Sequence, residues 1–495
     1  MAISNDLRCE KCGPDRLVPE AVPGICSGQI STTLARVELA YRQTRNLHMK
    51  SRTNFSATAL LLFTPLLTAA NWPNWRGPDY NGSSPETSLP ATFSRTENVK
   101  WTAELPGPSA ATPVIWGDKV FVSSTDSQKR SLLAICLDRR TGRELWRRDT
   151  GDKLSQDDKS NYASPSPVAD AQSVFFFYGS GELVAFDHDG GKLWDRNIES
   201  DYGPFAFWWT FSTSPVLHDG KLLLQVLQRD VIPRGDRDTS GPIDPYLLAL
   251  DPATGKELWK HTRPSDARAE SREAFTTPTP LISHYDPSGS AQPAERPELL
   301  VVGGDCISGH DPDTGRELWR WGTWNPGRIS HWRLVPSPVV GGRVVLACAP
   351  KGSPVYAFRL YGSGTLEDSW IAWKSEDRAV STDVSTPLYY QGRFYILNSD
   401  RRTLARVEPD TGKVDWVGEL ATRIKIEASP TAGDGKIYFM SHSGQVFVVA
   451  AGPEFEVLHS VEMGDEGDRD LRASISISQG DLYIRTGGKL YCIGR

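Results

Sequence analysis

Two short sequence signatures alternate along the 495 residues, and they predict an all-β fold, an eight-bladed β-propeller of four-stranded antiparallel blades. Three observations support this prediction. The first signature occurs eight times, the second follows it in constant order, and a strand near the N-terminus supplies what the last unit lacks. We therefore expect a ring closed by pairing of the N- and C-terminal strands, because closure removes exposed sheet edges.

The first signature is a hydroxylic residue and a proline, followed by an apolar strand, a turn and a second strand. Examples are ATPVIWGDKVFV at 111–122, SPVVGGRVVLA at 337–347 and SPTAGDGKIYF at 429–439. Short apolar runs with β-branched and aromatic members, separated by Gly and Asp turns, are typical of antiparallel strands. This signature therefore predicts the two inner strands, A and B, of each blade.

The second signature is a short apolar strand that ends in Asp, a turn and a Trp, as in LLALDPATGKELW at 247–259. In an Asp-x-x-Thr-Gly turn, the Asp and Thr side chains bind backbone N–H groups and Gly takes the left-handed conformation. Two copies are degraded, at 355–370 and 446–458, and NVKWTAEL at 98–105 carries the Trp that the final unit lacks. We expect each outer-strand Trp to dock one blade onto the next. The predicted docking residues are Trp101, Trp146, Trp194, Trp259, Trp319 and Trp416, with Gly142, Gly191, Gly255, Gly315 and Gly412.

The repeated motif resembles the tryptophan-docking motif of pyrroloquinoline-quinone (PQQ)-type propellers over roughly residues 72–495, as in Ala249-x-Asp251-x-x-Thr254-Gly255-x-x-x-Trp259. That superfamily contains both the quinoprotein dehydrogenases and the non-enzymatic assembly factor BamB. The opening WPNWRGPDYNGS at 72–83 is similar to the start of many secreted bacterial members described only as PQQ-binding-like repeat proteins. The motif holds blades together and does not touch cofactor, so the resemblance implies the fold and says little of function.

A quinoprotein dehydrogenase of the resembling family would carry adjacent cysteines in a disulfide, a Trp floor, calcium ligands from Glu, Asn and Asp, and a catalytic Asp. No two cysteines are adjacent here, and no haem-attachment motif is present. We therefore predict no cofactor, no catalytic residues and no metal site, with PQQ and calcium as the alternative. Whether the chain is an enzyme stays open, and a non-enzymatic role is favoured. An enzyme of another kind in the central channel is a further alternative.

The N-terminal region carries the features of an export signal. Two positive charges in Met49-Lys-Ser-Arg52 precede an apolar run at 57–67, and the small residues Thr68-Ala-Ala70 follow it. The run is too short to span a bilayer and no Cys follows it, so neither a transmembrane span in the mature chain nor a lipoprotein is expected. We predict an exported bacterial protein, periplasmic or extracellular. The expected organisation is a disordered 1–48 from a start codon assigned too early, a signal peptide at 49–70 cleaved after Ala70, a lead-in segment at 71–97, and the propeller at 98–495.

Charge and cysteine content exclude two kinds of partner or scaffold. Residues 71–495 carry 47 basic and 56 acidic side chains, and this net negative charge disfavours nucleic acid as a partner. The same region holds four widely spaced cysteines, too few for a disulfide framework. We expect them to be buried small hydrophobic residues: Cys136, Cys306, Cys348 and Cys492.

The long insertions predict a binding face. Those at 199–211, 260–275 and 320–334 connect strand D to the next strand A, and 226–246 connects B to C, so all four emerge on one face. Their aromatic and Arg residues have the composition of a binding hot spot, or else simply cover the core. We favour a monomeric non-enzymatic scaffold that binds an envelope protein, peptide or glycan here. The candidate residues are Tyr202, Phe205, Trp208, Trp209, Trp324, Arg328, His331, Trp332 and Arg333.

The central channel is a second candidate site. Several residues stand just before the predicted A strands and should enter the channel, and their charges would suit a small anion. They are Tyr162, Thr210, Phe275, Arg333, Lys425 and Arg472.

Overall fold

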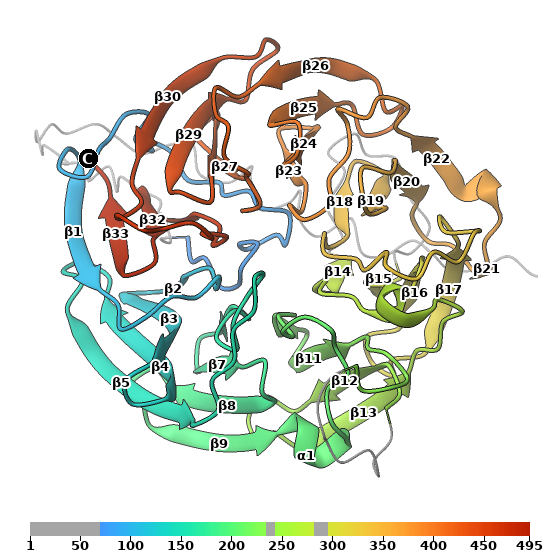
Figure 1. Ribbon diagram of the computed structural model, residues 1–495, viewed down its shortest axis with the longest axis horizontal. Coiled ribbons are helices and arrows are strands. Elements are labelled where there is room, and N and C mark those ends of the chain that lie inside the picture. Colours follow the sequence, from blue (N-terminus) through green and yellow to red (C-terminus); the bar gives the residue numbers. More distant parts are fainter. Residues whose placement is uncertain (1–69, 234–242, 282–295) are drawn as a thin grey trace, which may run out of the picture. The chain divides into compact units, whose positions relative to one another are not determined.

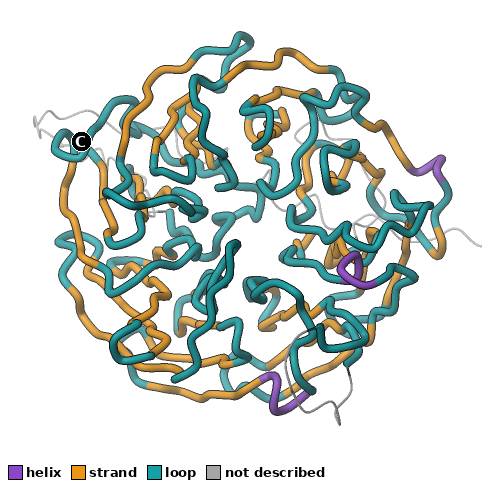
Figure 2. Tube along the Cα trace, viewed as in Figure 1, coloured by secondary structure: helices purple, strands orange, loops and turns teal. Residues whose placement is uncertain are grey.

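The computed structural model describes residues 70–233, 243–281 and 296–495. The predicted upstream segment and residues 49–69 of the signal peptide lie outside the described residues. Eight antiparallel sheets surround a central axis, as Figure 1 shows, and helical turns are few (Figure 2). The prediction of an all-β, eight-bladed propeller is therefore confirmed.

Each blade has four strands that run in chain order from the axis to the rim, except that the outermost strand of blade 8 is β1. Blade 1 contains β2 (Val114–Trp116), β3 (Lys119–Asp126), β4 (Ser131–Asp138) and β5 (Glu144–Gly151), and blade 2 contains β6 (Val168–Ala169), β7 (Ser173–Phe177), β8 (Glu182–Asp187) and β9 (Lys192–Asn197). Blade 3 contains β10 (Val216–His218), β11 (Lys221–Val226), β12 (Tyr246–Leu250) and β13 (Glu257–Thr262), and blade 4 contains β14 (Thr279–Leu281), β15 (Glu298–Gly303), β16 (Cys306–His310) and β17 (Glu317–Gly322). Blade 5 contains β18 (Val339–Gly341), β19 (Val344–Cys348), β20 (Val355–Arg359) and β22 (Ile371–Lys374), and blade 6 contains β23 (Leu388–Tyr390), β24 (Arg393–Asn398), β25 (Thr403–Val407) and β26 (Val414–Glu419). Blade 7 contains β27 (Thr431–Gly433), β28 (Lys436–Met440), β29 (Gln445–Ala450) and β30 (Val457–Glu462), and blade 8 contains β31 (Ser476–Ser478), β32 (Asp481–Arg485), β33 (Lys489–Ile493) and β1 (Val99–Glu104).

Within the described residues, three short helices and one extra strand lie in the connections between these strands. They are α1 (Ile198–Tyr202), the 3-10 turns η1 (Ala269–Arg272) and η2 (Asp368–Trp370), and β21 (Gly364–Thr365), which pairs parallel with β17.

The ring closes through the two ends of the propeller. Strand β1 pairs antiparallel with β33, the last strand of the chain, and the register places Trp101 opposite Cys492 and Ala103 opposite Leu490. One blade is therefore built from both ends, as the sequence predicted. Closure leaves no blade edge without a neighbour around the ring.

The hydroxylic residue of the first signature joins neighbouring blades at the channel. The backbone N–H of Thr112 donates to Ser166 Oγ at 2.9 Å, and that of Ser166 donates to Ser214 Oγ at 3.0 Å. Among the described residues, seven of the eight junctions carry this bond. The proline that follows in most copies has no N–H, and at these seven junctions the backbone donor is the Ser or Thr before this position.

The turn of the second signature receives the indole of the preceding blade. The Asp138 carboxylate accepts the N–H and hydroxyl of Thr141 at 2.8 and 2.6 Å, and Gly142 adopts a φ of +70°. The Trp101 ring lies against this turn, and its Nε1 donates to the Arg139 carbonyl at 2.7 Å. A Cβ on Gly142 would lie 2.5 Å from that ring, so only glycine fits.

The same contact recurs at four further junctions. Glycines lie against the rings of Trp146, Trp194, Trp259 and Trp373, and each indole N–H donates to a backbone carbonyl of the next blade. Trp416 makes only the hydrogen bond of this contact, which its Nε1 donates to the Gly452 carbonyl at 3.2 Å. The glycines are Gly190, Gly255, Gly315 and Gly412.

Two of the predicted docking residues lie differently. The glycine under Trp146 is Gly190, with a φ of +83°, and not Gly191, because this turn is one residue tighter: Gly190 N–H bonds to the Asp187 carbonyl. Trp319 donates to Glu298 Oε2 of its own blade at 2.7 Å. Blade 5 has no Asp-x-x-Thr-Gly turn to receive that indole, and the insertion carrying β21 takes its place.

The outer strand of blade 5 also starts later than the degraded signature suggests. The sequence placed the end of that copy at residue 370, but Trp370 belongs to η2 and the docked indole is Trp373 of β22. Blade 7 has no Trp on β30. The smaller ring of His459 on this strand makes a similar contact, because its Nε2 bonds to the Phe93 carbonyl at 2.7 Å. The degraded copy in blade 7 therefore keeps a polar ring contact, but this contact is with the lead-in segment.

The lead-in segment crosses the central channel and pairs with inner strands, as the blue trace in Figure 1 shows. Trp72 exchanges backbone hydrogen bonds with Ile115, and the Pro73 carbonyl accepts the N–H of Ala169. Farther along, the Asn81 and Gly82 carbonyls bond to blades 6 and 7. Without this segment, the inner strands would present unpaired backbone edges to the channel. The lead-in segment closes one end of the channel, and we call it the plug.

Arg76 fastens the plug. Its side chain is fully buried, and its guanidinium donates to the carbonyls of Pro430, Pro387 and Asn81 at 3.0, 2.8 and 2.9 Å. Burial lowers the pKa of Arg76 to about 9, so the side chain keeps its charge at neutral pH. A positive charge therefore lies at the closed end of the channel.

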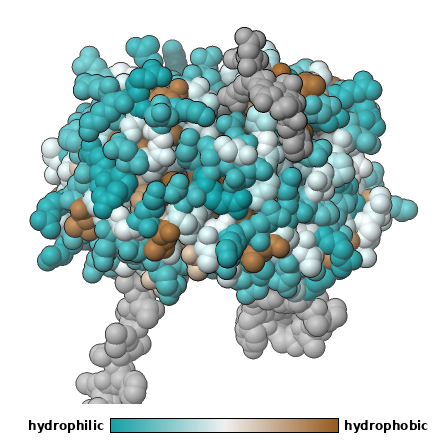
Figure 3. Space-filling model, turned by 90° about the horizontal axis from the view of Figure 1, so that it is seen from below, coloured by the Kyte–Doolittle hydropathy of each residue, from teal (hydrophilic) through white to brown (hydrophobic). Residues whose placement is uncertain are grey.

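The outer surface is mostly polar. Figure 3 shows apolar side chains scattered singly among polar ones on one side of the molecule. The more exposed large apolar residues include neighbours of the docked tryptophans, namely Leu145, Leu193 and Leu258. In the part of the chain that the structure describes, no helix has the length and apolar character needed to cross a membrane.

Candidate functional site

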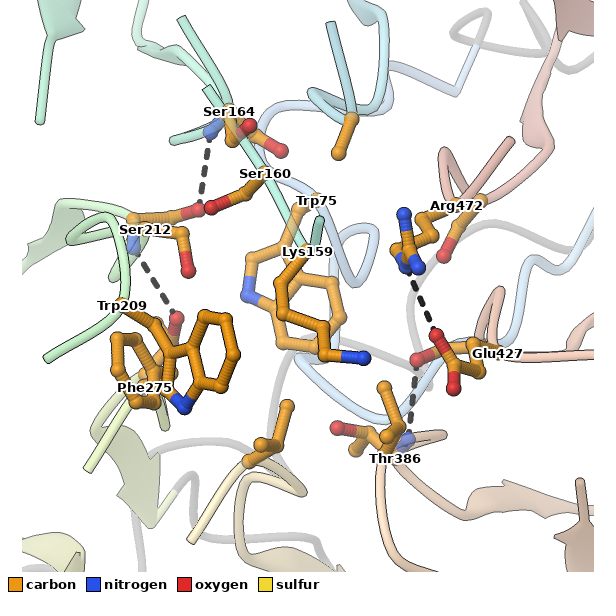
Figure 4. A pocket seen from close by; sticks show the side chains of 18 of the residues that line it. Trp75, Lys159, Ser160, Ser164, Trp209, Ser212, Phe275, Thr386, Glu427 and Arg472 are labelled. Carbon is orange, nitrogen blue, oxygen red and sulfur yellow. Dashed lines mark hydrogen bonds and ion pairs between the residues drawn. The ribbon is translucent and has the colours of Figure 1, made fainter. Parts of the chain in front are cut away.

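A pocket of about 290 Å³ lies on the axis, above the plug. All eight connections from a strand D to the next strand A contribute to its wall, together with Trp75 of the lead-in segment and Lys351 of a B-to-C turn. The insertion-bearing face and the pocket therefore belong to the same end of the propeller. Figure 4 shows the side chains that converge there, with Trp75 beneath Lys159.

The floor of the pocket is aromatic with a cation behind it. The guanidinium of Arg76 lies 5.4 Å from the centre of the Trp75 ring. Among the described residues, Arg76 bonds only to neutral carbonyls and forms no ion pair. Its charge is therefore not neutralised locally and favours an anion in the pocket above.

Hydroxyl groups encircle the pocket. All but one of the residues that join the blades also line it, and among the lining ones every hydroxyl except that of Ser474 accepts a neighbouring backbone N–H. A hydroxyl can accept and donate at once, so these groups retain a hydrogen that can be offered to a ligand. The lining hydroxylic residues of the junctions are Thr112, Ser166, Ser214, Thr277, Thr386, Ser429 and Ser474.

Positive charge exceeds negative charge in the wall. The carboxylates are Asp383 and Glu427. Asp383 lies 3.7 Å from the Lys351 ammonium, and Glu427 lies 2.8 Å from the Arg472 guanidinium. The cations of the wall are Lys159, Arg333, Lys351, Lys425 and Arg472.

Glu427 is held as an anion by two partners. Burial raises its pKa, but the hydrogen bond from His442 Nε2 at 3.0 Å and the charge of Arg472 outweigh burial and lower the pKa to about 2. A carboxylate so paired is neutralised within the wall. The free positive charge of the pocket therefore comes from elsewhere, and Lys159 is its clearest source.

Lys159 projects into the pocket without an ion-pair partner among the described residues. Its ammonium lies 5.6 Å from the centre of the Trp209 ring, and Arg333 lies 5.9 Å from the same ring. Trp209 is fixed by a hydrogen bond from its Nε1 to Glu270 Oε1 at 3.0 Å. This aromatic wall with flanking cations can receive a flat anionic group.

The residues predicted to form an exposed binding face do not form one continuous patch. Phe205 and Trp324 are only 4% and 5% exposed and cover the core, whereas Trp208 is 37% exposed. Arg328 and His331 are exposed, and Tyr202 and Trp332 are half-buried. Trp209 and Arg333 instead line the central pocket.

The structure brings the predicted channel residues together more closely than the residues of the predicted binding face. Thr210, Phe275, Arg333, Lys425 and Arg472 all line the pocket. Tyr162 lies outside the lining, and its carbonyl accepts the N–H of Gly179. The charges expected at the channel entrance are therefore in place around it.

Sequence reasoning missed several lining residues. Three of them stand a few residues before a strand A, namely Lys159, Asp383 and Glu427. The channel residues that were predicted correctly were recognised by this same position. Trp75 belonged to a recognised segment but had no predicted location. Lys351 comes from a short turn after β19, and no pattern in the sequence marks it.

The insertion at 199–211 is anchored by a buried acid. Glu273 is fully buried, and its Oε1 accepts the N–H of Trp208 at 3.0 Å and pairs with Arg229. Burial raises the pKa of Glu273 to about 7, although the charge of Arg229 opposes the shift. The folded state therefore binds this proton more tightly than the unfolded chain does.

We predict that this proton makes stability depend on pH. Between about pH 4.5 and 7 the folded state holds more protons at Glu273 than the unfolded state, so the free energy of unfolding should fall as pH rises. In Glu273→Gln the free energy of unfolding should decline less steeply with pH, because the variant lacks this one titrating group. Urea unfolding at several pH values measures it, with the exposed Glu419→Gln as control. An unchanged slope in Glu273→Gln would contradict the assignment.

The pocket does not fit the calcium-dependent quinone site that the resemblance would imply. Among the described residues, no group of three His, Cys, Asp or Glu is placed to hold a metal ion. Glu427 already bonds to His442 and Arg472. The cysteines of the described chain are buried, as predicted; they are also all free, and none lines the pocket: Cys136, Cys306, Cys348 and Cys492.

The ring of tryptophan-docked blades and the axial pocket define a propeller of the PQQ-like class. The chain belongs to the PQQ-like β-propeller family: residues 91–229 and 244–493 match the family model described as outer membrane protein assembly factor BamB. The resemblance noted in the sequence is thereby confirmed.

Two curated relatives are polyvinylalcohol dehydrogenases. The one from a Pseudomonas species is 27% identical over 198 residues, which cover 39% of this chain and 29% of the relative. The one from Sphingopyxis sp. (strain 113P3) is 25% identical over 284 residues, 52% of this chain and 40% of the relative. The alignments thus span less than half the length of these relatives.

Two solved structures share the fold. The quinohemoprotein alcohol dehydrogenase from Comamonas testosteroni has a TM-score of 0.57 at 14% identity and covers 86% of this chain and 81% of its own. A europium-containing methanol dehydrogenase has a TM-score of 0.58 at 12% identity and covers 85% and 90%. At these identities the likeness concerns the fold alone.

Proposed function

We propose that this protein is a non-enzymatic binding module that takes an anionic group of its ligand into the axial pocket on the insertion-bearing face. The observation that carries the proposal is the excess of cations around an aromatic floor and wall, with Lys159 lacking an ion pair among the described residues. Ser and Thr hydroxyls around the wall add hydrogen-bond donors. A carboxylate-bearing envelope protein, peptide or glycan has the chemistry that this pocket would recognise.

A planar aromatic tricarboxylate, trimesate, is a suitable probe. Trp75 and Trp209 line the pocket, so binding should change the tryptophan fluorescence of the protein, and calorimetry gives the dissociation constant. Affinity should weaken as salt rises, because the attraction is between charges. The uncharged analogue benzene-1,3,5-trimethanol should bind far less tightly.

Lys159→Ala should weaken trimesate binding by about tenfold, since a charge-assisted hydrogen bond contributes roughly 1.5–3 kcal/mol. Lys153→Ala, which removes an exposed lysine of the same connection outside the pocket, should leave the affinity within about twofold. The double variant Arg333→Ala and Arg472→Ala should abolish binding. Unchanged binding of every acidic ligand by that double variant would overturn the proposal.

A dehydrogenase is the second candidate function, because the curated relatives with sequence similarity are polyvinylalcohol dehydrogenases. The lack of a metal-binding set in the described residues speaks against the calcium-dependent form. Purified protein mixed with PQQ, with and without calcium, should not oxidise polyvinyl alcohol or simple alcohols in a dye-linked assay if the binding role holds. Sustained turnover that requires PQQ would replace the first proposal with this one.

We further propose that the protein acts after export, with Ala70 as the last residue removed. The residue next to this position is held by its side chain: Asn71 Oδ1 accepts the N–H of Gly117 at 2.8 Å. A mature chain starting at Asn71 would keep this contact. Expression of the full chain in a bacterial host, fractionation and N-terminal sequencing should return Asn71 from the exported material.

A further inference from the structure

A second cleft lies apart from the axial pocket, between blades 3 and 4. It has a volume of about 790 Å³ and is lined by the end of β13, the turn between β15 and β16, the end of β17 and the loops that follow β13 and β17. Cys306, Arg320, Asp305 and Asn325 are among its lining residues. Nothing in the proposed binding function uses this cleft.

The Cys306 sulfur faces two guanidinium groups. Its Sγ lies 3.2 Å from Arg263 Nη2 and 3.5 Å from Arg320 Nη1. As a thiol it donates to the Gly303 carbonyl at 3.3 Å. The sulfur thus faces Arg263 and also Arg320, whose guanidinium pairs with Glu317 at 2.5 Å, and neighbouring guanidinium groups are typical of reactive cysteines.

The charge of Arg263 has no carboxylate to balance it. The side chain is fully buried, and among the described residues it bonds to Ser308 Oγ, the Gly303 carbonyl and the Cys306 sulfur but to no acid. A buried cation is costly unless an anion lies near it. Among the described residues, the Arg263 guanidinium therefore faces neutral oxygens and the Cys306 sulfur.

The cleft also holds an acceptor without a donor. Asp305 is only 5% exposed; its Oδ2 accepts from Asn325 Nδ2 at 2.9 Å, whereas Oδ1 has no hydrogen-bond partner in the described chain. Burial raises the pKa of Asp305 to about 6. An unpartnered buried oxygen in a cleft indicates that a donor group is missing there.

The other three cysteines of the described chain provide an internal comparison. Cys136, Cys348 and Cys492 lie within strands of the blade cores, and burial raises the pKa of each thiol. They belong to apolar clusters, whereas Cys306 lines the cleft beside two guanidinium groups. They are therefore the inert thiols against which Cys306 can be measured.

We propose that Cys306 is an oxidation site at which hydrogen peroxide converts the thiol to a sulfenic acid. The sulfur anion attacks one peroxide oxygen; the S–O bond forms as the O–O bond breaks, and the leaving hydroxide takes up the thiol proton to give water. Sulfur loses two electrons and the peroxide gains them. Cys306 is only 5% exposed, so a small oxidant suits the site. The new S–O–H group supplies a donor to a cleft that contains the unpartnered Asp305 Oδ1.

The test uses the full chain, treated with hydrogen peroxide at neutral pH and trapped with dimedone, followed by peptide mass spectrometry. Cys306 should be labelled at least about tenfold faster than the three core cysteines. In Cys306→Ser, peroxide-dependent labelling should disappear from the described part of the chain while far-UV circular dichroism stays unchanged. Equal, slow labelling of all four cysteines would overturn the proposal.

Arg320 is a positioning residue for the sulfur anion, and its variant separates that role from a structural one. Arg320→Gln should slow the labelling of Cys306 about fivefold at neutral pH and shift its pH–rate profile toward higher pH, because one charged donor is lost. Arg316→Gln removes an exposed arginine of the same blade and should change neither. A profile in Arg320→Gln identical to that of the parent protein would contradict the role of the guanidinium.

Discussion

Replacing Trp101 by alanine should lower the free energy of unfolding by about 3–5 kcal/mol, the usual cost of removing a buried Trp side chain. The ring is 7% exposed, its Nε1 bonds to the Arg139 carbonyl at 2.7 Å, and it packs on Gly142 of blade 1. Because Trp101 stands on β1, the strand that closes the ring, its loss weakens the junction on which closure depends. Urea unfolding followed by circular dichroism measures the change.

Trp208→Ala is the matched control for this prediction. That side chain is 37% exposed and contacts Arg229 through its ring face, so the change should cost no more than about 1 kcal/mol. If both variants unfold at the same urea concentration as the parent protein, docking by Trp101 contributes little to the stability of the ring.

Replacing Arg76 by alanine should cost a similar amount, about 3–5 kcal/mol, because it removes charge-assisted hydrogen bonds and leaves the carbonyls of Pro430 and Pro387 without this donor. These two bonds tie the plug to blades 6 and 7, so the variant should also free the plug from them. Limited proteolysis should then cut within 71–97 much faster than in the parent protein.

Arg95→Ala is the control for Arg76, since Arg95 is an exposed arginine of the same lead-in segment. It should leave both the unfolding midpoint and the proteolysis rate unchanged. Release of the plug should also weaken trimesate binding, because Trp75 would leave the floor. A stable Arg76→Ala protein with an intact, protease-resistant lead-in segment would show that backbone pairing alone holds the plug.

Much of the fold could be predicted because each blade repeats the same local physics. A Ser or Thr before strand A and an Asp-x-x-Thr-Gly turn before Trp mark positions where hydrogen bonding and a left-handed glycine are obligatory. Errors occurred where the repeat decays. The adjacent glycines Gly190 and Gly191 allowed two turn lengths, and the insertion in blade 5 replaced the turn that Trp319 would have met.

The site was only partly predictable for a different reason. Its wall is assembled from eight connections of unequal length, and strand periodicity fixes where each connection ends but not which way its side chains point. Arg333 and Arg472 stand close to the strands and were placed correctly. Phe205 and Trp324 lie in the middle of long insertions, where aromatic composition fits core cover as well as an exposed surface.

The pairing of β1 with β33 has a consequence for how the protein is made. Strand β1 leaves the ribosome long before its partner β33, so blade 8 stays incomplete while the seven other blades are synthesised. Bringing together strands so distant in the chain is entropically slow, and the waiting edges are open to aggregation. The chain therefore has reason to rely on a holding chaperone until β1 and β33 have paired.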